Sequence, residues 1–255
     1  MSTTLMFGRT GNRLLDALAE QDFQRLVPHI EATPMAFKQI FHKQGQTIAH
    51  AYFPTGGVGS VTKVMNDGSM IEVATAGMEG MIGVELFLGE RSAVNEALMQ
   101  VAGPDGWRIS AAQILGELER RGTFWDLIRR YTVVFMAAAQ QSVACNGLHN
   151  VEERCCRWLL TTQDRIGSDR VRLTQEFLAV MLGVRRPTVT IVLGTLEKAG
   201  LLELHRGEVR IVDRSRLEAA SCECYRMSLQ DYELLLPECN GKRRYAGSVE
   251  VGRHS

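Results

Sequence analysis

The sequence predicts an α+β fold in which short strands come first, one long helix follows, and a small helical unit with a hairpin comes last. Three observations predict it. Between residues 33 and 109, short apolar stretches alternate with glycine-rich turns, a pattern typical of antiparallel sandwiches. From Phe124 to Leu148, apolar residues recur at helical spacing. Residues 173–212 have the pattern of two short helices followed by two strands.

Length and composition favour a soluble protein with two modest domains. The chain has 255 residues, of which 45% are hydrophobic, so real cores can form. It shows no apolar run of membrane-spanning length and no leader segment, which predicts a cytoplasmic protein with no membrane partner. The net charge is zero, but residues 150–216 carry 12 basic against 9 acidic side chains (+3), and residues 1–112 carry 8 against 11 (−3). The basic excess therefore lies in the segment that contains the two short helices and two strands, and an excess of this sign favours contact with a phosphate backbone.

Residues 1–112 are expected to form an antiparallel β-roll or jelly roll. Two short amphipathic helices, at 12–18 and 23–30, precede its strands. The Asn66-Asp67-Gly68 segment is a strong hairpin signal, because these residues tolerate left-handed backbone conformations. The expected strands are 35–37, 48–53, 58–64, 71–74, 97–101 and 107–109.

Residues 113–149 are expected to contain a long coupling helix, from about Phe124 to Leu148. One set of its residues recurs with alternating steps of three and four, which is the pattern of a coiled-coil seam. Two interpretations stay open: the seam pairs with a second copy of the chain, or the helix packs on its own β-roll. The candidate dimer residues are Leu127, Tyr131, Val134, Ala138, Gln141 and Cys145.

Residues 150–217 are expected to form a winged helix. A helix over 151–165 comes first. Thr174 is then a suitable N-cap for a helix that ends at Gly183, and Pro187 suits the first turn of the next helix. A hairpin over 203–212 follows directly. The remaining segment, 218–255, is expected to hold a short helix and a disordered tail. The helix covers about 217–227, and the composition is that of a disordered tail beyond Pro237.

Basic and hydroxyl side chains gather at the start of the second helix of this pair. Arginine can pair with a phosphate or a guanine edge, and threonine can bond phosphate oxygens, so this end is suited to a DNA major groove. The candidate DNA contacts are Arg185, Arg186, Thr188 and Thr190, with Thr174 and Gln175 on the preceding helix and Arg206 in the wing.

The segment GVRRPTVTIVLGTLEK at 183–198, with LTQEFLAVML before it and AGLLELHRGEVRIVDRSRLE after it, resembles the C-terminal domain of the Crp/Fnr family of bacterial transcription regulators. The resemblance covers about residues 12–225. It implies a homodimer, paired through the long helix, that binds a palindromic operator in double-stranded DNA, with RNA polymerase as a further candidate partner. The best-known members have a Glu directly after the Arg and a second base-reading Arg later, where this chain has Pro187 and Ile191. Their operator sequence therefore does not carry over.

The same resemblance makes residues 1–112 a cyclic-nucleotide-binding-like sensor domain. In cyclic-nucleotide binders a Gly-Glu pair holds the ribose, and an Arg-Ser or Arg-Thr followed by Ala holds the cyclic phosphate. Here Val84 follows Gly83 and Glu85 comes one place late, whereas Arg91-Ser92-Ala93 matches. Arg91 is equally well explained as a solvated turn residue. The candidate ligand residues are Gly83, Glu85, Arg91 and Ser92, and the candidate effector is a cyclic nucleotide or another small molecule, with no cofactor firmly assigned.

The other chemistry-bearing residues predict neither a metal nor a catalytic site. Six cysteines in a chain without a secretion signal favour free thiols. Cys222 and Cys224 with Cys239 could form a metal clip, but the spacing matches no common zinc pattern and no fourth ligand is evident. The histidines include no His-x-His pair of the cupin type, and no hydrolase, phosphate-loop or dinucleotide motif occurs. The rival function is a nucleotide-sensing signalling protein whose winged helix binds protein rather than DNA.

Overall fold

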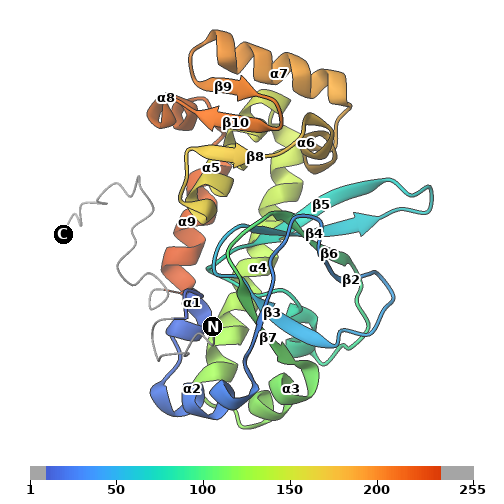
Figure 1. The fold of residues 1–255 in the computed structure, drawn as a ribbon, viewed down its shortest axis with the longest axis vertical. Helices are drawn as coiled ribbons and strands as arrows, with labels where there is room; N and C mark the ends of the chain where they lie inside the picture. The colour runs from blue at the N-terminus through green and yellow to red at the C-terminus, as the bar shows by residue number, and fades with distance from the viewer. Residues whose placement is uncertain (1–9, 237–255) are drawn as a thin grey trace, which may run out of the picture.

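A computed structural model describes residues 10–236, and Figure 1 shows the resulting arrangement: a β-roll, a central long helix, and a helical head at the top. The elements of the β-roll are α1 (Arg13–Asp16), α2 (Glu20–Leu26), η1 (Val27–His29), β1 (Glu31–Thr33), β2 (Ile40–His42), β3 (His50–Phe53), β4 (Val58–Val64), β5 (Met70–Ala76), η2 (Val84–Leu88), β6 (Glu96–Val101) and β7 (Gly106–Ser110). The rest comprises α3 (Ala111–Glu119), α4 (Thr123–Leu148), α5 (Val151–Ile166), β8 (Arg170–Arg172), α6 (Gln175–Leu182), α7 (Arg186–Lys198), β9 (Leu202–His205), β10 (Glu208–Ile211), α8 (Arg214–Ala219) and α9 (Cys224–Leu235).

The predicted α+β fold class is confirmed. Two antiparallel sheets, of order β1-β7-β3 and β2-β6-β4-β5, form the β-roll, and a third sheet, β8-β10-β9, lies in the head. The hairpin expected at Asn66-Asp67-Gly68 joins β4 to β5, with Gly68 at a positive φ of 81°. The strand expected at 35–37 is wrong: that segment is unpaired loop, and β1 lies before it at Glu31–Thr33.

The head has the predicted winged-helix order of helices and strands. Its first helix, α5, begins with a capping box in which the Asn150 side chain and the Glu153 carboxylate each accept a backbone N–H of the other residue. After the wing, the single helix expected at 217–227 is wrong, because the chain leaves α8 at Ala219 and restarts as α9 at Cys224. The tail expected to be disordered beyond Pro237 lies outside the described residues.

The long helix α4 matches its predicted bounds, but the candidate dimer seam is largely wrong. Leu127, Tyr131 and Val134 are at most 2% exposed and pack into the β-roll core of their own chain, and Cys145 is also fully buried. A residue that its own chain buries has no surface left to offer a partner. The remaining two seam residues, Ala138 and Gln141, lie on the side that α9 covers. The alternative interpretation, packing on the chain's own β-roll, therefore holds for the first half of this face, and the second half packs against α9 and the segment before it.

A different face of α4 is exposed and apolar. Val133, Met136 and Val143 are 47%, 52% and 74% exposed, and with Gln140 and Gly147 they recur in steps of three and four along the helix. We call these five residues the exposed stripe. Because the spacing is that of a coiled-coil seam, the stripe is suited to a second helix of the same kind.

One turn of the β-roll, residues 77–80, fastens both α4 and α5. The Tyr131 hydroxyl of α4 donates to the Met81 carbonyl oxygen over 2.9 Å, and a Cβ at Gly80 would lie only 2.4 Å from that hydroxyl. In the same turn, Glu79 forms a buried ion pair with Arg165 of α5, with 2.6 Å between oxygen and nitrogen. The turn thus fixes how the head sits on the roll.

Removing Glu79 should destabilise the fold strongly. In the Glu79→Ala variant the Arg165 guanidinium stays buried without its carboxylate, which typically costs about 3–5 kcal/mol. The control is Glu31→Ala, which breaks the exposed Glu31–Arg108 pair and should cost less than about 1 kcal/mol. Urea denaturation of both variants measures the difference, and equal losses would contradict the role given to this pair.

Glu72 of β5 should make stability depend on pH. It faces α5 and accepts a hydrogen bond from the Ser60 hydroxyl (2.8 Å). Burial raises its pKa from 4.5 to about 7, although Ser60, Arg157 and Arg165 oppose the shift. Because the folded-state pKa is the higher one, the protonated form stabilises the fold fully below pH 4.5, and this stability is lost as the pH rises through about 7.

The matched variant is Glu72→Gln, which keeps the shape and removes the titration. The free energy of unfolding of the native chain, minus that of the variant, should fall between pH 5 and pH 8. Denaturation curves at several pH values measure this difference. A difference that stays constant with pH would show that Glu72 titrates normally.

Candidate nucleic-acid interface

Two helices that meet at a steep angle form the centre of the head. The side-chain hydroxyl of Thr174 accepts the Phe177 N–H (3.2 Å), so its predicted N-cap role in α6 is confirmed. Gly183 ends α6 at a positive φ of 62°, and α7 then leaves at 104° to α6. Pro187 lies in the first turn of α7, where its missing N–H has no helical partner to lose. This pair then presents the N-terminal end of α7 outward.

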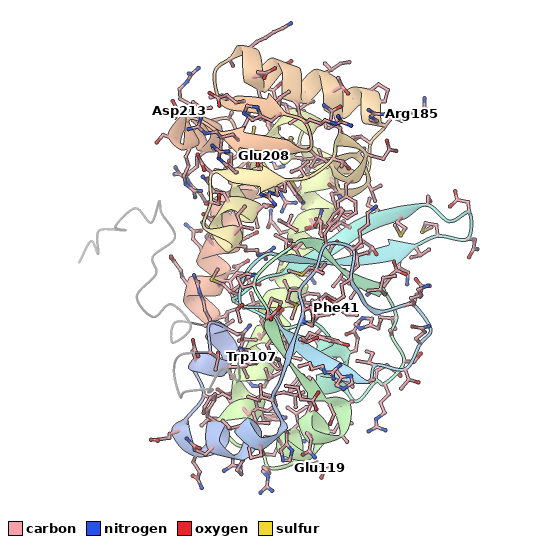
Figure 2. The ribbon with its side chains drawn as sticks, in the orientation of Figure 1. Phe41, Trp107, Glu119, Arg185, Glu208 and Asp213 are labelled. Carbon is pink, nitrogen blue, oxygen red and sulfur yellow. The ribbon has the colours of Figure 1, made fainter. Side chains whose placement is uncertain are left out.

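The predicted DNA-binding residues surround that end of α7. Figure 2 shows Arg185 at its tip, where it projects away from the head. Arg186 and Thr190 are also exposed, and Thr188 is half-buried. The Thr190 hydroxyl donates to the Gln175 carboxamide oxygen over 2.7 Å, which ties α7 to α6. Five of the seven predicted contacts thus lie at the junction of the two helices: Gln175, Arg185, Arg186, Thr188 and Thr190.

A groove separates this junction from the wing. It has a volume of about 470 Å³ and is lined by Thr174, Gln175 and Arg186 on one side and by Arg206 and Gly207 of the β9–β10 turn on the other. The two remaining predicted contacts, Thr174 and Arg206, also line it, as do the acidic residues Glu176 and Glu208. Such a concave surface between helix and wing can hold a strand of nucleic acid backbone.

The charges at the groove are unevenly neutralised. Arg186 has only a loose, exposed ion pair with Glu176, with 3.8 Å between nitrogen and oxygen. Within the described residues, Arg185 and Arg206 form no ion pair or side-chain hydrogen bond. By contrast, Arg210 of β10 is held by Asp169 and Glu203 (3.1 and 3.0 Å). Arginine charge is therefore most available at the start of α7 and at the wing tip.

The sequence prediction missed the outward face of α7. Ile191 is 70% exposed, and Thr195 and Lys198 follow it on the same exposed side. Ile191, Thr195 and Lys198 follow Pro187 at helical spacing, so the periodicity of the sequence is enough to place them on one face of the helix. An exposed apolar side chain on this face is suited to contact the methyl group of thymine.

Over residues 10–236, no single helix is long and apolar enough to cross a bilayer. Within that range, only α6 and α7 taken together reach that length and apolarity, across their sharp bend.

The predicted effector residues lie on one segment of the β-roll. Gly83 has a positive φ of 96° and begins η2, where Glu85 is half-buried. Arg91 and Ser92 follow the next turn and are exposed, and Ser92 donates its N–H to the Glu90 carboxylate (2.7 Å). The Arg91 guanidinium has no ion pair among residues 10–236. The geometry thus leaves Arg91 open to an anion without bringing it against Glu85.

The interior of the β-roll holds polar groups that the chain does not satisfy. In the described part of the chain, both ring nitrogens of His42 and both polar atoms of the Gln100 carboxamide are buried without a hydrogen-bond partner. Burial lowers the pKa of His42, which Glu85 partly offsets. Such groups are rare in protein interiors, and they are suited to a polar ligand.

Comparison with known proteins supports the description of the head. Residues 153–220 match the model of the Crp-like helix-turn-helix domain. No curated protein matches the chain.

Several solved structures share the overall fold. A CRP-family transcriptional regulator from Thermus thermophilus is 18% identical, with a TM-score of 0.62, and the match covers 75% of this chain and 96% of that one. FixK2 from Bradyrhizobium japonicum is 16% identical, with a TM-score of 0.64 and coverage of 76% and 98%. The global regulator CLP from Xanthomonas campestris is 15% identical, with a TM-score of 0.62 and coverage of 76% and 100%. At these identities the likeness concerns the fold.

Proposed function

We propose that this chain, which carries a Crp-like helix-turn-helix domain on the fold of Crp/Fnr regulators, is a sequence-specific DNA-binding transcription regulator that acts as a homodimer. The observation that carries the proposal is the outward N-terminal end of α7, where Arg185 is exposed and has no ion pair with any residue of the range 10–236. The groove between this end of α7 and the β9–β10 turn supplies a second surface for contact with DNA. A phosphate backbone is the polyanion that such an arrangement binds best.

The residues at this end of α7 have different roles in the proposal. Arg186, at the first helical position, is the candidate for pairing with a guanine edge, and Arg185 for a phosphate. Ile191 takes the place of the second base-reading Arg of the best-known Crp/Fnr members and would contact a thymine methyl. Arg206 of the wing and four hydroxyl or amide residues of α6, its N-cap and α7 would position the DNA backbone: Thr174, Gln175, Thr188 and Thr190.

The homodimer would form through the exposed stripe on α4. Two such stripes packed together would bury the valine and methionine side chains that the single chain leaves in water. A two-fold axis along this seam would present two copies of α7 to successive major grooves, one helical turn or ~34 Å apart. This geometry is what makes the expected operator palindromic.

Effector control is the remaining part of the proposal. The open Arg91 guanidinium and the unsatisfied polar interior of the roll support a small anionic effector. The structural neighbour CLP is c-di-GMP responsive, which supports this class of ligand. An effector would act through the turn at 77–80, since that turn touches both α4 and α5, by shifting the population between two placements of the head.

Replacing Arg186 should weaken operator binding. If Arg186 pairs with a base, Arg186→Ala should cost ~1–3 kcal/mol and relax specificity at one position. Arg185→Ala should weaken binding to all sequences and lower the salt slope by about 1. The control is Arg120→Ala, an equal loss of charge directly after α3, which lies at the opposite end of the molecule from α7 (Figure 1). Anisotropy titrations with a selected operator measure all three, and equal affinities of the Arg186 and Arg120 variants would remove Arg186 from the interface.

The same titrations separate DNA from a protein partner. DNA affinity must fall steeply with ionic strength, because bound phosphates release counterions. A chain that holds no duplex at any salt concentration would favour the rival function, in which the winged helix docks on protein.

Placing a charge in the exposed stripe should separate the dimer. Val143→Glu should give a monomer and lose most operator affinity, because two carboxylates would meet at the seam without solvent. Leu234→Glu is the matched control, since Leu234 is as exposed (78%) but lies on α9. Sedimentation velocity measures the state of both variants. A Val143→Glu variant that stays dimeric would place the interface elsewhere.

A further inference from the structure

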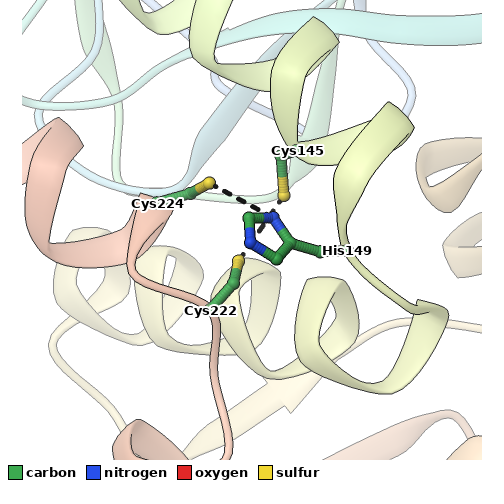
Figure 3. Close-up of side chains that lie close together, drawn as sticks. All are labelled: Cys145, His149, Cys222 and Cys224. Carbon is green, nitrogen blue, oxygen red and sulfur yellow. Dashed lines mark hydrogen bonds between the residues drawn. The ribbon is translucent and has the colours of Figure 1, made fainter.

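Four side chains with metal-binding atoms meet where the long helix ends. Cys145 and His149 lie one turn apart at the end of α4, Cys222 lies in the α8–α9 connection, and Cys224 begins α9. Figure 3 shows the four converging from the two segments. Their ligand atoms all lie within 4.8 Å of one another. The sequence showed no evident fourth ligand for a clip of Cys222, Cys224 and Cys239. Cys239 lies outside the described residues, and the fold brings Cys145 and His149 beside Cys222 and Cys224 instead.

The distances suit one tetrahedral ion. The Sγ atoms of Cys145 and Cys222 are 3.5 Å apart, and the Cys224 Sγ is 3.5 Å from the His149 Nδ1. Two sulfurs bound to one Zn²⁺ with bonds of ~2.3 Å at a tetrahedral angle lie ~3.8 Å apart. The same separation is too long for a disulfide, whose sulfurs are ~2.05 Å apart. Ligands that are all mutually this close surround a single ion rather than a cluster of several.

The surroundings match those of a bound metal. His149 turns its Nδ1 to the cysteines and its Nε2 to the Glu223 carboxylate, 3.2 Å away, which is the orientation that a carboxylate gives to a metal-bound histidine. The Gln141 carboxamide donates to the Cys224 sulfur over 2.9 Å, a bond suited to a thiolate. The three cysteines are at most 4% exposed, and the His149 side chain is 16% exposed, so the cluster is largely shielded from solvent.

Positive charge is also available for such a site. Three thiolates with one Zn²⁺ carry a net charge of −1, and α5 places Arg154 and Arg157 near enough to interact electrostatically with the Cys145 sulfur. The Nε atom of each arginine is buried without a hydrogen-bond partner among the described residues. Arg154 also donates to the carbonyl oxygens of Asn146 and Leu182, and a buried anionic centre would further offset the charge of both guanidinium groups.

We propose that Cys145, His149, Cys222 and Cys224 bind one Zn²⁺ in a closed structural site. Thiolate and imidazole ligands in tetrahedral array select zinc over hard cations. The four ligands leave no coordination position for a substrate, so the ion has a structural role. It joins the end of α4 to the start of α9 directly beside the α4–α5 junction.

This position gives the metal a consequence for regulation, which rests on the proposed function. The exposed stripe of α4 would hold the dimer, and α5 carries the rest of the head. A zinc ion at the junction would limit the directions in which α5 can leave α4, and so would fix the separation of the two copies of α7. Zinc-loaded protein should therefore bind the operator more tightly than zinc-free protein.

Metal binding is tested on the full-length native chain. Elemental analysis should find one zinc per chain. After removal of zinc, Co²⁺ should restore one equivalent with intense sulfur-to-cobalt charge-transfer bands and tetrahedral d–d bands, and Zn²⁺ should abolish both. Cys222→Ser and His149→Gln should lose this binding, whereas Cys155→Ala should keep it, because Cys155 lies in the separate core of the head. Absence of metal from the native chain together with a Co²⁺ spectrum that lacks thiolate bands would overturn the site.

The regulatory consequence has a separate readout. Removal of zinc should lower operator affinity about tenfold, and added Zn²⁺ should restore it. If the zinc-free and zinc-loaded forms bind the operator equally, the coupling is wrong although the site stands. If neither form binds any duplex, the proposed function fails while the cobalt spectrum still decides the metal site.

Discussion

The burial of one face of α4 against the β-roll is the constraint on which the rest of the structure depends. This packing is fixed at one point, where Gly80 leaves room for the Tyr131 ring and the Tyr131 hydroxyl donates a hydrogen bond to the Met81 carbonyl oxygen. Since the same turn holds Arg165 through Glu79, the roll, α4 and α5 meet at one place. Any signal that moves this turn therefore acts on both helices at once.

Fixing one face of α4 determines what its other parts can do. The opposite face is left as a stripe of exposed valine and methionine, which is suited to a second copy of the chain. The end of the helix brings Cys145 and His149 against the segment before α9, where a zinc ion would brace the junction with the head. In the proposed function, sensing, pairing and DNA reading would therefore depend on one helix, and α7 lies at the far end of the head from the β-roll (Figure 1).

Local signals in the sequence were sufficient for α6, α7 and the wing, although not for the break between α8 and α9. Thr174, Gly183 and Pro187 set the ends of α6 and α7 through capping and backbone conformation, which act within a few residues. The buried face of α4 was taken for the candidate dimer face because the helix is apolar on two sides, and the set with Leu127 and Tyr131 recurs in steps of three and four just as the set with Val133 and Met136 does. Periodicity alone does not show which side meets the roll. The Cys and His cluster was missed because 77 positions separate Cys145 from Cys222, and only the fold of the head brings them together.

The central claim is that two copies of α7, held in fixed register, read DNA. Selection of bound fragments from genomic DNA by the purified protein tests it most directly. The account predicts enrichment of fragments that share an inverted repeat, with half-sites centred about 10 base pairs apart. Recovery of fragments with no common repeat, at the level of a protein that binds no DNA, would contradict it.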